Sequence, residues 1–389
     1  MTDHTYVWLP ERHLGVAATL SHADELIGQI ADLLFDYQTQ PDDVIGLREV
    51  PAGRFSRTVV ERVAPIPRKV PLLVADALVA LRAALEHALF AEVEFLDGAP
   101  LDEKAAKLVE MPASDTHEKF AEWKKKRARN GPPSLRAGGE LARRIEALQP
   151  FHRHAQAELH PLARLVLHTN HAKHRTPAIT AVRLAVMIRD DQKPRSLRDY
   201  SPLPEEPMRI GDIIAETPLG TKVPVTLFPT VGINRPGTDR WPVLIKELDE
   251  ISGWVRTQAV PRLITGTEPP EAPLPARYEI TVGHEDEREA MSMGSRTTAV
   301  DRYQLRLGAA SARIDLADLI SRIDGSPDRG QLVAWLEQLA DAEVMERVGR
   351  LGAAFNYEAG IVLRNVEILN GLRDEALAFG RETQTAGEH

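Results

Sequence analysis

The chain has 389 residues. A domain with a single hydrophobic core is usually shorter than this, so two domains are expected. Its 43% hydrophobic and 27% charged residues are typical of a globular protein in water. Cysteine is absent, which excludes disulfides, thiolate metal ligands and a cysteine nucleophile. No apolar run approaches the roughly 18 residues that span a bilayer, and the N-terminus lacks a secretory pattern, so we expect a cytoplasmic protein without a membrane segment.

The first part of the chain predicts helices beside one pair of strands. An N-cap pattern predicts that a helix begins at Ser21. Val44–Val50 and Phe55–Val63 are typical of strands, and the Pro-Ala-Gly between them predicts an antiparallel pair. Val70–Phe90 is apolar on most of its surface, as a helix at the centre of a domain would be.

The middle of the chain predicts short helices and then strands. Residues 151–175 are expected to form two helices separated at Pro161, a residue that suits a first helical position. Runs rich in Val, Ile and Thr then predict further strands. The expected helices outside 151–175 are Glu118–Arg129, Leu141–Leu148 and Trp241–Ile264, and the expected strands are Ala178–Ile188, Met208–Ile214 and Val223–Val231.

Four prolines within residues 265–276 predict a linker between two domains. The expected fold class is α+β and helix-dominated. An N-terminal domain, 1–264, would combine a helical core with a small antiparallel sheet. A mostly helical domain, 277–383, would follow the linker, and residues 384–389 would form a frayed tail.

Residues 119–175 form a basic segment in an acidic chain. The segment holds thirteen Lys and Arg against four Glu, a net charge of +9, whereas the whole chain carries −9. Charge separation on this scale creates a local field that attracts anions. The sequence therefore predicts a positive surface patch here, with RNA or another polyanion as the partner and a homodimer as a further arrangement.

Histidines in the basic segment first suggest a metal site. His168, His171 and His174 follow at three-residue steps, and imidazole is a common metal ligand. Around a helix, however, His168 and His174 lie about 120° apart, and no acidic residue occurs within 160–175. Solvated or packed histidines are the simpler interpretation, so we expect neither a metal nor a cofactor.

A second hypothesis is a metal-independent ribonuclease that uses an Arg and a His from one helix. The His would act as general acid or base, and the Arg would hold the scissile phosphate. Four pairs have the R-x4–6-H spacing, about as many as chance gives in a chain so rich in Arg. Three lie on expected helices and the fourth spans a predicted strand and turn; the pairs are Arg82/His87, Arg153/His160, Arg164/His171 and Arg277/His284.

The segment 76–87 resembles a group of uncharacterised bacterial proteins whose helix has an L-R-x-x-L-[D/E]-H core. Gln149-Pro150 and Lys173-His174-Arg175 match the Gln-Pro and K-H-R segments of that group. The resemblance covers about residues 70–180 and is HEPN-like in its helix with R-x4-H. It implies that Arg82, His87 and Lys173 to Arg175 belong to one constellation. From the faces of the two helices we expect the end of the 162–175 helix to approach His87 or Arg82, so that His87, His174 and an Arg surround one concavity.

The third hypothesis concerns phosphate binding by the basic helix that bears Trp123. Lys124, Lys125, Lys126, Arg127 and Arg129 would contact phosphates and Trp123 would stack on a base, although such a run is more often only a solvated face. Arg164, His168, His171 and Lys173 would extend the interface, because on a helical wheel the basic residues 164, 168, 171 and 175 share one side.

Two functions follow from these patterns. The first is an RNA-directed, metal-independent, HEPN-like endoribonuclease with catalytic residues among Arg82, His87, Arg153, His160, His174 and Arg175. The second is a non-enzymatic binding or structural protein whose basic segment contacts nucleic acid or an acidic partner. Nucleotide-binding and serine-hydrolase motifs are absent from the sequence.

Overall fold

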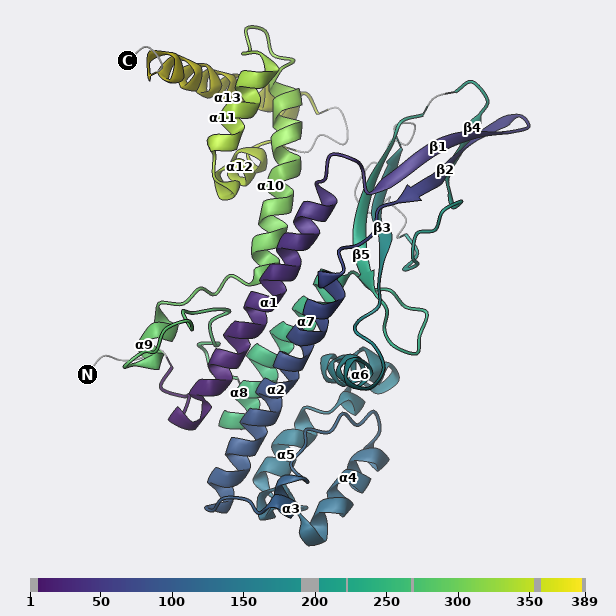
Figure 1. The fold of residues 1–389 in the computed structure, drawn as a ribbon. Helices are drawn as coiled ribbons and strands as arrows, with labels where there is room; N and C mark the ends of the chain where they lie inside the picture. The colour runs from purple at the N-terminus through teal and green to yellow at the C-terminus, as the bar shows by residue number, and fades with distance from the viewer. Residues whose placement is uncertain (1–5, 190–202, 222, 267–268, 353–357, 387–389) are drawn as a thin grey trace. The chain divides into compact units, whose positions relative to one another are not determined.

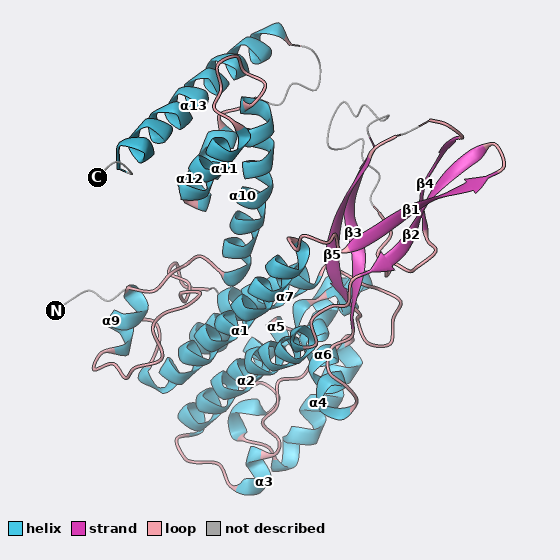
Figure 2. Ribbon diagram, turned by 45° about the horizontal axis from the view of Figure 1, so that its top comes forward, coloured by secondary structure: helices cyan, strands magenta, loops and turns pink. Residues whose placement is uncertain are grey.

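The computed structural model describes residues 6–189, 203–221, 223–266, 269–352 and 358–386. Helices dominate, beside one sheet of three strands and one of two, which confirms the expected α+β class (Figures 1 and 2). The chain forms two compact units: unit 1 comprises residues 1–187 and 203–300, and unit 2 comprises 188–202 and 301–389. Across the described ranges, no helix has the length and apolar character needed to cross a membrane.

Two long helices, α1 (Leu14–Gln38) and α2 (Lys69–Asp97), lie along each other at the centre of unit 1. The predicted central helix is confirmed and continues seven residues beyond Phe90, to Asp97; Gly98 follows as its C-cap, in the left-handed conformation with a φ of +70°. Its apolar side chains form the core of unit 1 and include Val70, Leu73, Val74, Leu78, Leu81, Leu85, Leu89 and Val93.

The first helix does not begin at Ser21, as the capping pattern predicted. It begins seven residues earlier, after the 3₁₀ turn η1 (Glu11–His13). Ser21 lies buried inside α1, where its hydroxyl donates to the carbonyl of Tyr278 at 3.1 Å. The serine is therefore used for a contact with a distant segment rather than for a cap.

The antiparallel pair β1 (Ile45–Ala52) and β2 (Phe55–Val63) is confirmed, and Gly53 takes a φ of +65° in the turn. A third strand, β4 (Ile213–Pro218), pairs antiparallel with the other edge of β2. A separate sheet joins β3 (Thr180–Arg189) to β5 (Val225–Ile233). β3 and β5 confirm the predicted strands 178–188 and 223–231.

The predicted strand 208–214 is displaced toward the C-terminus in β4. The Asp212 carboxylate accepts the Arg209 amide at 2.7 Å, and Gly211 has a φ of +94°. This turn keeps residues 209–212 out of the strand.

Shorter helices complete unit 1. The break at Pro161 is confirmed, with Pro161 as the first residue of α6 and His160 as its cap. The predicted helix 241–264 is interrupted by the π-helical turn η5, because Pro261 has no N–H to donate to the carbonyl four residues before it. These elements are α3 (Glu103–Ala106), α4 (His117–Asn130), η2 (Pro133–Leu135), α5 (Glu140–Ala147), η3 (Pro150–Leu159), α6 (Pro161–His174), α7 (Leu244–Trp254), η5 (Val255–Ala259), α8 (Val260–Thr265) and α9 (Glu287–Ser292).

The proline-rich segment 265–276 was predicted to separate two domains, but the two compact units divide near residue 300. The segment and its continuation are held to the N-terminal part of unit 1 by polar contacts. The Trp8 indole donates to the Ala272 carbonyl at 3.0 Å, and Arg288 donates to the Leu9 carbonyl at 2.8 Å. The prolines of this segment interrupt regular secondary structure, but the segment remains packed on unit 1 and is not a linker between domains.

Unit 2 is helical, as predicted for the C-terminal part. Its described elements are α10 (Ala299–Ile320), which starts within unit 1, α11 (Arg329–Gln338), α12 (Asp341–Gly349) and α13 (Ala359–Ala386). A core of its own includes Leu316, Ile320, Leu332, Trp335, Leu336, Val344 and Leu372. The frayed tail predicted from residue 384 is wrong up to Ala386, where α13 ends, and residues 387–389 lie outside the described part.

Candidate nucleic-acid interface

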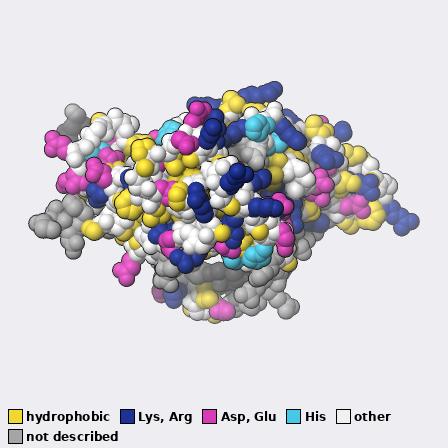
Figure 3. All heavy atoms as spheres, turned by 90° about the horizontal axis from the view of Figure 1, so that it is seen from below, with side chains coloured by type: hydrophobic (Ala, Val, Ile, Leu, Met, Phe, Trp, Pro, Cys, Tyr) yellow, Lys and Arg dark blue, Asp and Glu magenta, His cyan; other side chains and the backbone are white. Residues whose placement is uncertain are grey.

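The basic segment 119–175 supplies α4, η2, α5, η3 and α6, all within unit 1. Viewed from below in Figure 3, Lys and Arg side chains gather at the end of unit 1 that carries α3 to α5, with acidic side chains between them. Whether these cations can meet a polyanion depends on which of them are already neutralised by carboxylates.

Six of the thirteen cations form ion pairs with carboxylates of described residues. These pairs are Lys119–Asp115 at 2.7 Å, Lys124–Glu146 at 3.3 Å, Arg127–Glu110 at 3.9 Å, Arg143–Glu140 at 2.5 Å, Arg144–Glu92 at 3.4 Å and Arg164–Glu247 at 2.7 Å. Within the described ranges of unit 1, none of the thirteen pairs with a carboxylate from 277–290. The segment is therefore not a surface that docks on this acidic part of its own unit.

Trp123 and Arg127 were predicted to face a nucleic acid, but both are buried, with 8% and 3% of their surface exposed. The Arg127 guanidinium lies 4.0 Å from the centre of the Trp123 ring, and its Nε donates to the Leu108 carbonyl at 2.7 Å. Trp123 also stacks on Phe120, with ring centres 5.4 Å apart. Residues 120, 123 and 127 share the inner face of α4. This buried face was not recognised in the sequence because the helix is rich in Lys and Arg.

The predicted basic stripe on α6 is also wrong for two of its members. Arg164 and His168 are 2% and 4% exposed and bind the buried Glu247 of α7, at 2.7 Å and 3.3 Å. Arg235 adds two further bonds to the same carboxylate, at 3.0 Å and 2.8 Å. Burial raises the pKa of Glu247, but bonds from His168 and Arg235 and the charge of Arg164 outweigh it and hold that pKa well below its usual range.

A second buried carboxylate, Glu92 of α2, was missed in the sequence. It accepts from Arg12 and His13, both at 2.7 Å, and lies 3.4 Å from Arg144. Burial raises the pKa of Glu92, and the bonds from His13 and Arg12 lower it by more. The sequence did contain a signal for this site: Glu92 lies on the apolar side of α2. A carboxylate buried there needs cationic partners, so its position predicts an ion-pair cluster.

Arg82, predicted to act with His87, is engaged by groups other than His87. Arg82 is 9% exposed, lies 2.5 Å from Glu86 and donates to the Met111 carbonyl at 2.7 Å. Glu86 in turn accepts the Met111 amide at 2.9 Å. These contacts tie the chain after α3 to α2, whereas His87 faces solvent.

Arg153 and His160 are likewise engaged in local structure. Arg153 donates to the Leu159 carbonyl at 2.9 Å, and His160 Nδ1 accepts the Leu162 amide at 3.2 Å. The His160 ring also meets Trp254 edge-on, 5.1 Å between centres. Burial and the nearby charge of Arg153 lower the pKa of His160 to about 4. His160 is thus a neutral helix cap at neutral pH.

The structure separates His87 from the K-H-R segment. Thr176, directly after that segment, lines the same cavity as Leu72 at the start of α2. A helix rises about 1.5 Å per residue, so α2 places Leu72 roughly 22 Å from His87. The expected concavity around His87, His174 and Arg82 is therefore not formed. Lys173, His174 and Arg175 are exposed near the opposite end of α2, and His171 lies beside Ala75 and Leu78.

Four exposed cations remain around the end of α4: Lys125, Lys126, Arg129 and Arg136, here called the α4 basic surface. In the described part of the chain, none of these four has a carboxylate partner. Arg136 donates to the Gly131 carbonyl at 3.2 Å, which brings it back to the helix end. Cations near a helix C-terminus also face its partial negative charge, so this clustering costs little repulsion.

Gly131 allows the chain after α4 to turn back toward the end of the helix. A Cβ atom at residue 131 would lie 2.8 Å from both the Cβ and the carbonyl oxygen of Arg127, closer than real side chains approach. The glycine therefore lets the chain turn tightly across the last turn of α4, where its carbonyl accepts from Arg136.

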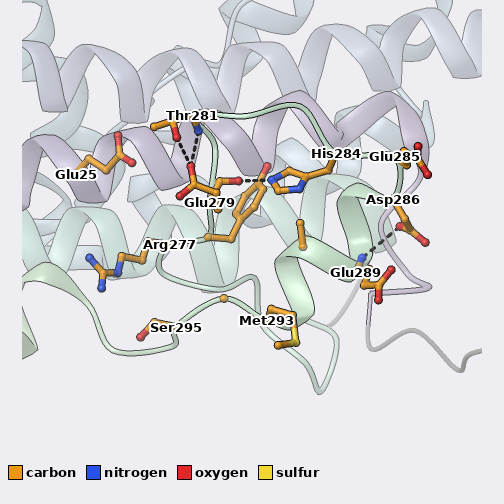
Figure 4. A pocket seen from close by; sticks show the side chains of 13 residues that line it. Glu25, Arg277, Glu279, Thr281, His284, Glu285, Asp286, Glu289, Met293 and Ser295 are labelled. Atoms are coloured by element: carbon orange, nitrogen blue, oxygen red, sulfur yellow. Dashed lines mark hydrogen bonds between the residues drawn. The ribbon is translucent and has the colours of Figure 1, made fainter.

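A cavity of about 780 Å³ elsewhere in unit 1 has the opposite character. Carboxylates dominate its lining, with Arg277 and His284 as the basic members (Figure 4). The acidic residues are Glu25, Glu279, Glu285, Asp286 and Glu289. Some of its polar groups shape the wall itself: His284 bonds the Glu279 carbonyl at 2.6 Å, and Asp286 caps α9. This cavity repels phosphates, so it offers no place for a nucleic acid.

No group of three or more His, Asp or Glu side chains among the described residues is arranged to hold a metal ion. The histidine series that first suggested a metal site is divided, because His168 binds Glu247 while His174 is exposed. No protein-family model, curated protein or solved structure matches the chain.

Proposed function

We propose that unit 1 binds RNA through the phosphates, using the α4 basic surface, and does not cleave it. The observation that carries this proposal is the contrast within the basic segment: six cations are neutralised by carboxylates, whereas Lys125, Lys126, Arg129 and Arg136 are exposed without one. Exposed cations gathered on one face supply the sequence-independent part of nucleic-acid affinity.

The proposed binding relies on charge rather than stacking. Trp123 and Phe120, the aromatic side chains of α4, are buried in the core of unit 1. Lys125 and Arg129 lie one helical turn apart on the outer face, so both can contact the same strand. We therefore expect weak sequence preference and strong dependence on salt.

We do not propose cleavage, because a member of each of the two pairs Arg82/His87 and Arg153/His160 makes contacts that stabilise the fold. Arg82 is held by Glu86 and Met111, and His160 caps α6. Neither pair presents both a free guanidinium and a free imidazole to a phosphate, which the ribonuclease hypothesis requires.

The test combines one variant with a charge-matched control. In the full-length chain, Lys125→Gln, Lys126→Gln and Arg129→Gln together should weaken binding of a fluorescein-labelled 20-nucleotide RNA at least tenfold in fluorescence anisotropy. The control removes three exposed cations of unit 1 far from this surface in sequence: Arg54→Gln, Arg209→Gln and Arg240→Gln. It should change affinity less than twofold.

The same RNA, incubated with the protein in EDTA and resolved on a denaturing gel, should remain intact. Cleavage in EDTA would support the ribonuclease hypothesis instead. Equal loss of binding in the variant and the control would show that net charge, and not the α4 basic surface, determines affinity.

A further inference from the structure

A second cavity of unit 1, of about 730 Å³, is apolar and lies where the end of β2, the start of α2 and the chain entering β3 meet. Ala64 and Val182 are buried there, whereas Leu72 and Ile179 expose 51% and 45% of their surface. We call it the β2–α2 groove. A ligand that covered these exposed apolar side chains would gain hydrophobic burial.

The charge at the groove has one sign. Among the described residues, Arg68 is the charged residue that lines it, and no carboxylate does. Arg68 is exposed and has no ion pair among the residues that the structure describes. Lys69 follows it and Arg175 precedes Thr176 of the lining, and both are exposed, so the rim is basic. A guanidinium with free N–H groups binds a carboxylate in bidentate geometry.

The first turn of α2 adds to this preference. The helix dipole places partial positive charge there, although the Val70 N–H is donated to the Pro67 carbonyl at 3.0 Å and Pro71 has no N–H. Arg68 precedes the first residue of α2, so its side chain and the helix end favour an anion at one place.

The remaining lining favours a hydrocarbon over a peptide. Apart from Arg68, its polar side chains are Thr176 and Thr180. An extended peptide carries a polar group at every residue and needs partners along its length, whereas an alkyl chain needs none. The volume lies within the range of roughly 300–1,000 Å³ that is common for small-molecule sites.

We infer that the β2–α2 groove binds a medium-chain fatty acid, with its carboxylate at Arg68 and its alkyl chain over Leu72 and Ile179. Arg175, the last residue of the K-H-R segment, then acts as part of the basic rim around an anionic ligand. This site shares no residue with the α4 basic surface, so the two proposals stand or fall separately.

The experiment uses displacement of 11-(dansylamino)undecanoic acid from the full-length chain by dodecanoate, below the micelle concentration. Saturable binding at one site per chain is expected, with displacement at least tenfold weaker for dodecanol, which lacks the carboxylate. Arg68→Gln and Leu72→Glu should each weaken dodecanoate binding at least tenfold. Far-UV circular dichroism checks that both exposed substitutions leave the fold intact.

Two matched controls decide where the ligand sits. Val79→Glu places the same charge two turns further along the same side of α2, outside the lining, and Arg54→Gln removes an exposed cation from the β1–β2 turn. Both should bind as the wild type does. The inference is overturned if no saturable binding occurs, if dodecanol competes as well as dodecanoate, or if Arg68→Gln and Leu72→Glu bind like their controls.

Discussion

The Arg164 guanidinium and the Glu247 carboxylate, 2.7 Å apart, join α6 to α7 with almost no contact with water. Arg164 also reaches Glu250 at 2.7 Å, and Arg235 binds Glu247 from the chain that follows β5. Two charges withdrawn from water in this way are stable only while their partners remain. The segment predicted to bind an anion thus uses its most buried Arg to bind a carboxylate of its own chain.

Arg164→Met should destabilise the protein by about 3–5 kcal/mol, because it leaves the buried Glu247 without one of its cations. Urea unfolding followed by circular dichroism measures the loss. The matched control is Lys119→Met, which removes an exposed pair with Asp115 and should cost under about 1 kcal/mol. A similar small loss in both variants would mean that Arg235 and His168 alone satisfy Glu247.

Acid should destabilise the protein through Glu247. A carboxylate whose folded pKa lies below its unfolded value, about 4.3, contributes stability above that value and loses it as the pH falls toward the folded pKa. We expect the free energy of unfolding to fall from pH 5 to pH 3. In Glu247→Gln, which starts from a lower stability, this fall should be shallower; an unchanged slope would assign it to other carboxylates.

His160 should also make the free energy of unfolding depend on pH, but at higher pH than Glu247 and because the folded state disfavours its protonated form. Its folded pKa, about 4, lies below the ordinary histidine value of 6.5, so the unfolded chain binds the proton more tightly. Stability should therefore fall as the pH drops from 6.5 to 4, by on the order of 2 kcal/mol, since partial exposure weakens the effect.

His160→Asn should remove this pH dependence while it preserves capping, because Asn also accepts an amide bond at a helix start. Chemical denaturation at several pH values between 4 and 7 measures the change. His87→Asn, which replaces an exposed histidine, is the control and should keep the wild-type slope. Loss of the slope in both variants would contradict a specific role for His160.

Local signals in the sequence predicted much of the fold. The hairpin β1–β2 and the apolar helix α2 follow from periodicity and a turn, which are properties of neighbouring residues. Ser21 and the segment 265–276 were misread because their roles depend on contacts across the chain. The Ser21 contact joins α1 to Tyr278, more than 250 residues away, and no local pattern records it.

In the candidate interface, too, local features could be predicted from the sequence and contacts between distant residues could not. That residues 119–175 carry a positive surface was readable from charge alone. Which cations remain exposed was not, because the partners Glu92 and Glu247 lie 52 residues before Arg144 and 83 residues after Arg164. Burial of Trp123 was visible only as its spacing from Phe120 and Arg127, which a helix places on one face.

Gly131→Ala should destabilise the protein by about 1–3 kcal/mol, because the added methyl meets the Arg127 backbone and the turn must open. Thermal unfolding measures the loss. Gly253→Ala, at a position on α7 where a Cβ meets nothing within 4 Å, should instead be neutral or stabilise by about 0.5–1 kcal/mol. Equal effects would show that the contact at Gly131 relaxes without cost.

Salt should weaken RNA binding in proportion to the phosphates that the α4 basic surface neutralises. For single strands, the logarithm of the association constant falls by about 0.7 per contacted phosphate for each tenfold rise in salt concentration. Four exposed cations therefore predict a slope of about −3 for the wild type. Replacing Lys125, Lys126 and Arg129 by Gln should reduce it to about −1, whereas the triple variant at Arg54, Arg209 and Arg240 should keep the wild-type slope. Anisotropy titrations between 50 mM and 300 mM KCl, on two RNAs of unrelated sequence, measure both slope and sequence preference. A slope near zero, or a strong preference for one RNA, would mean that contacts other than these phosphates hold the complex together.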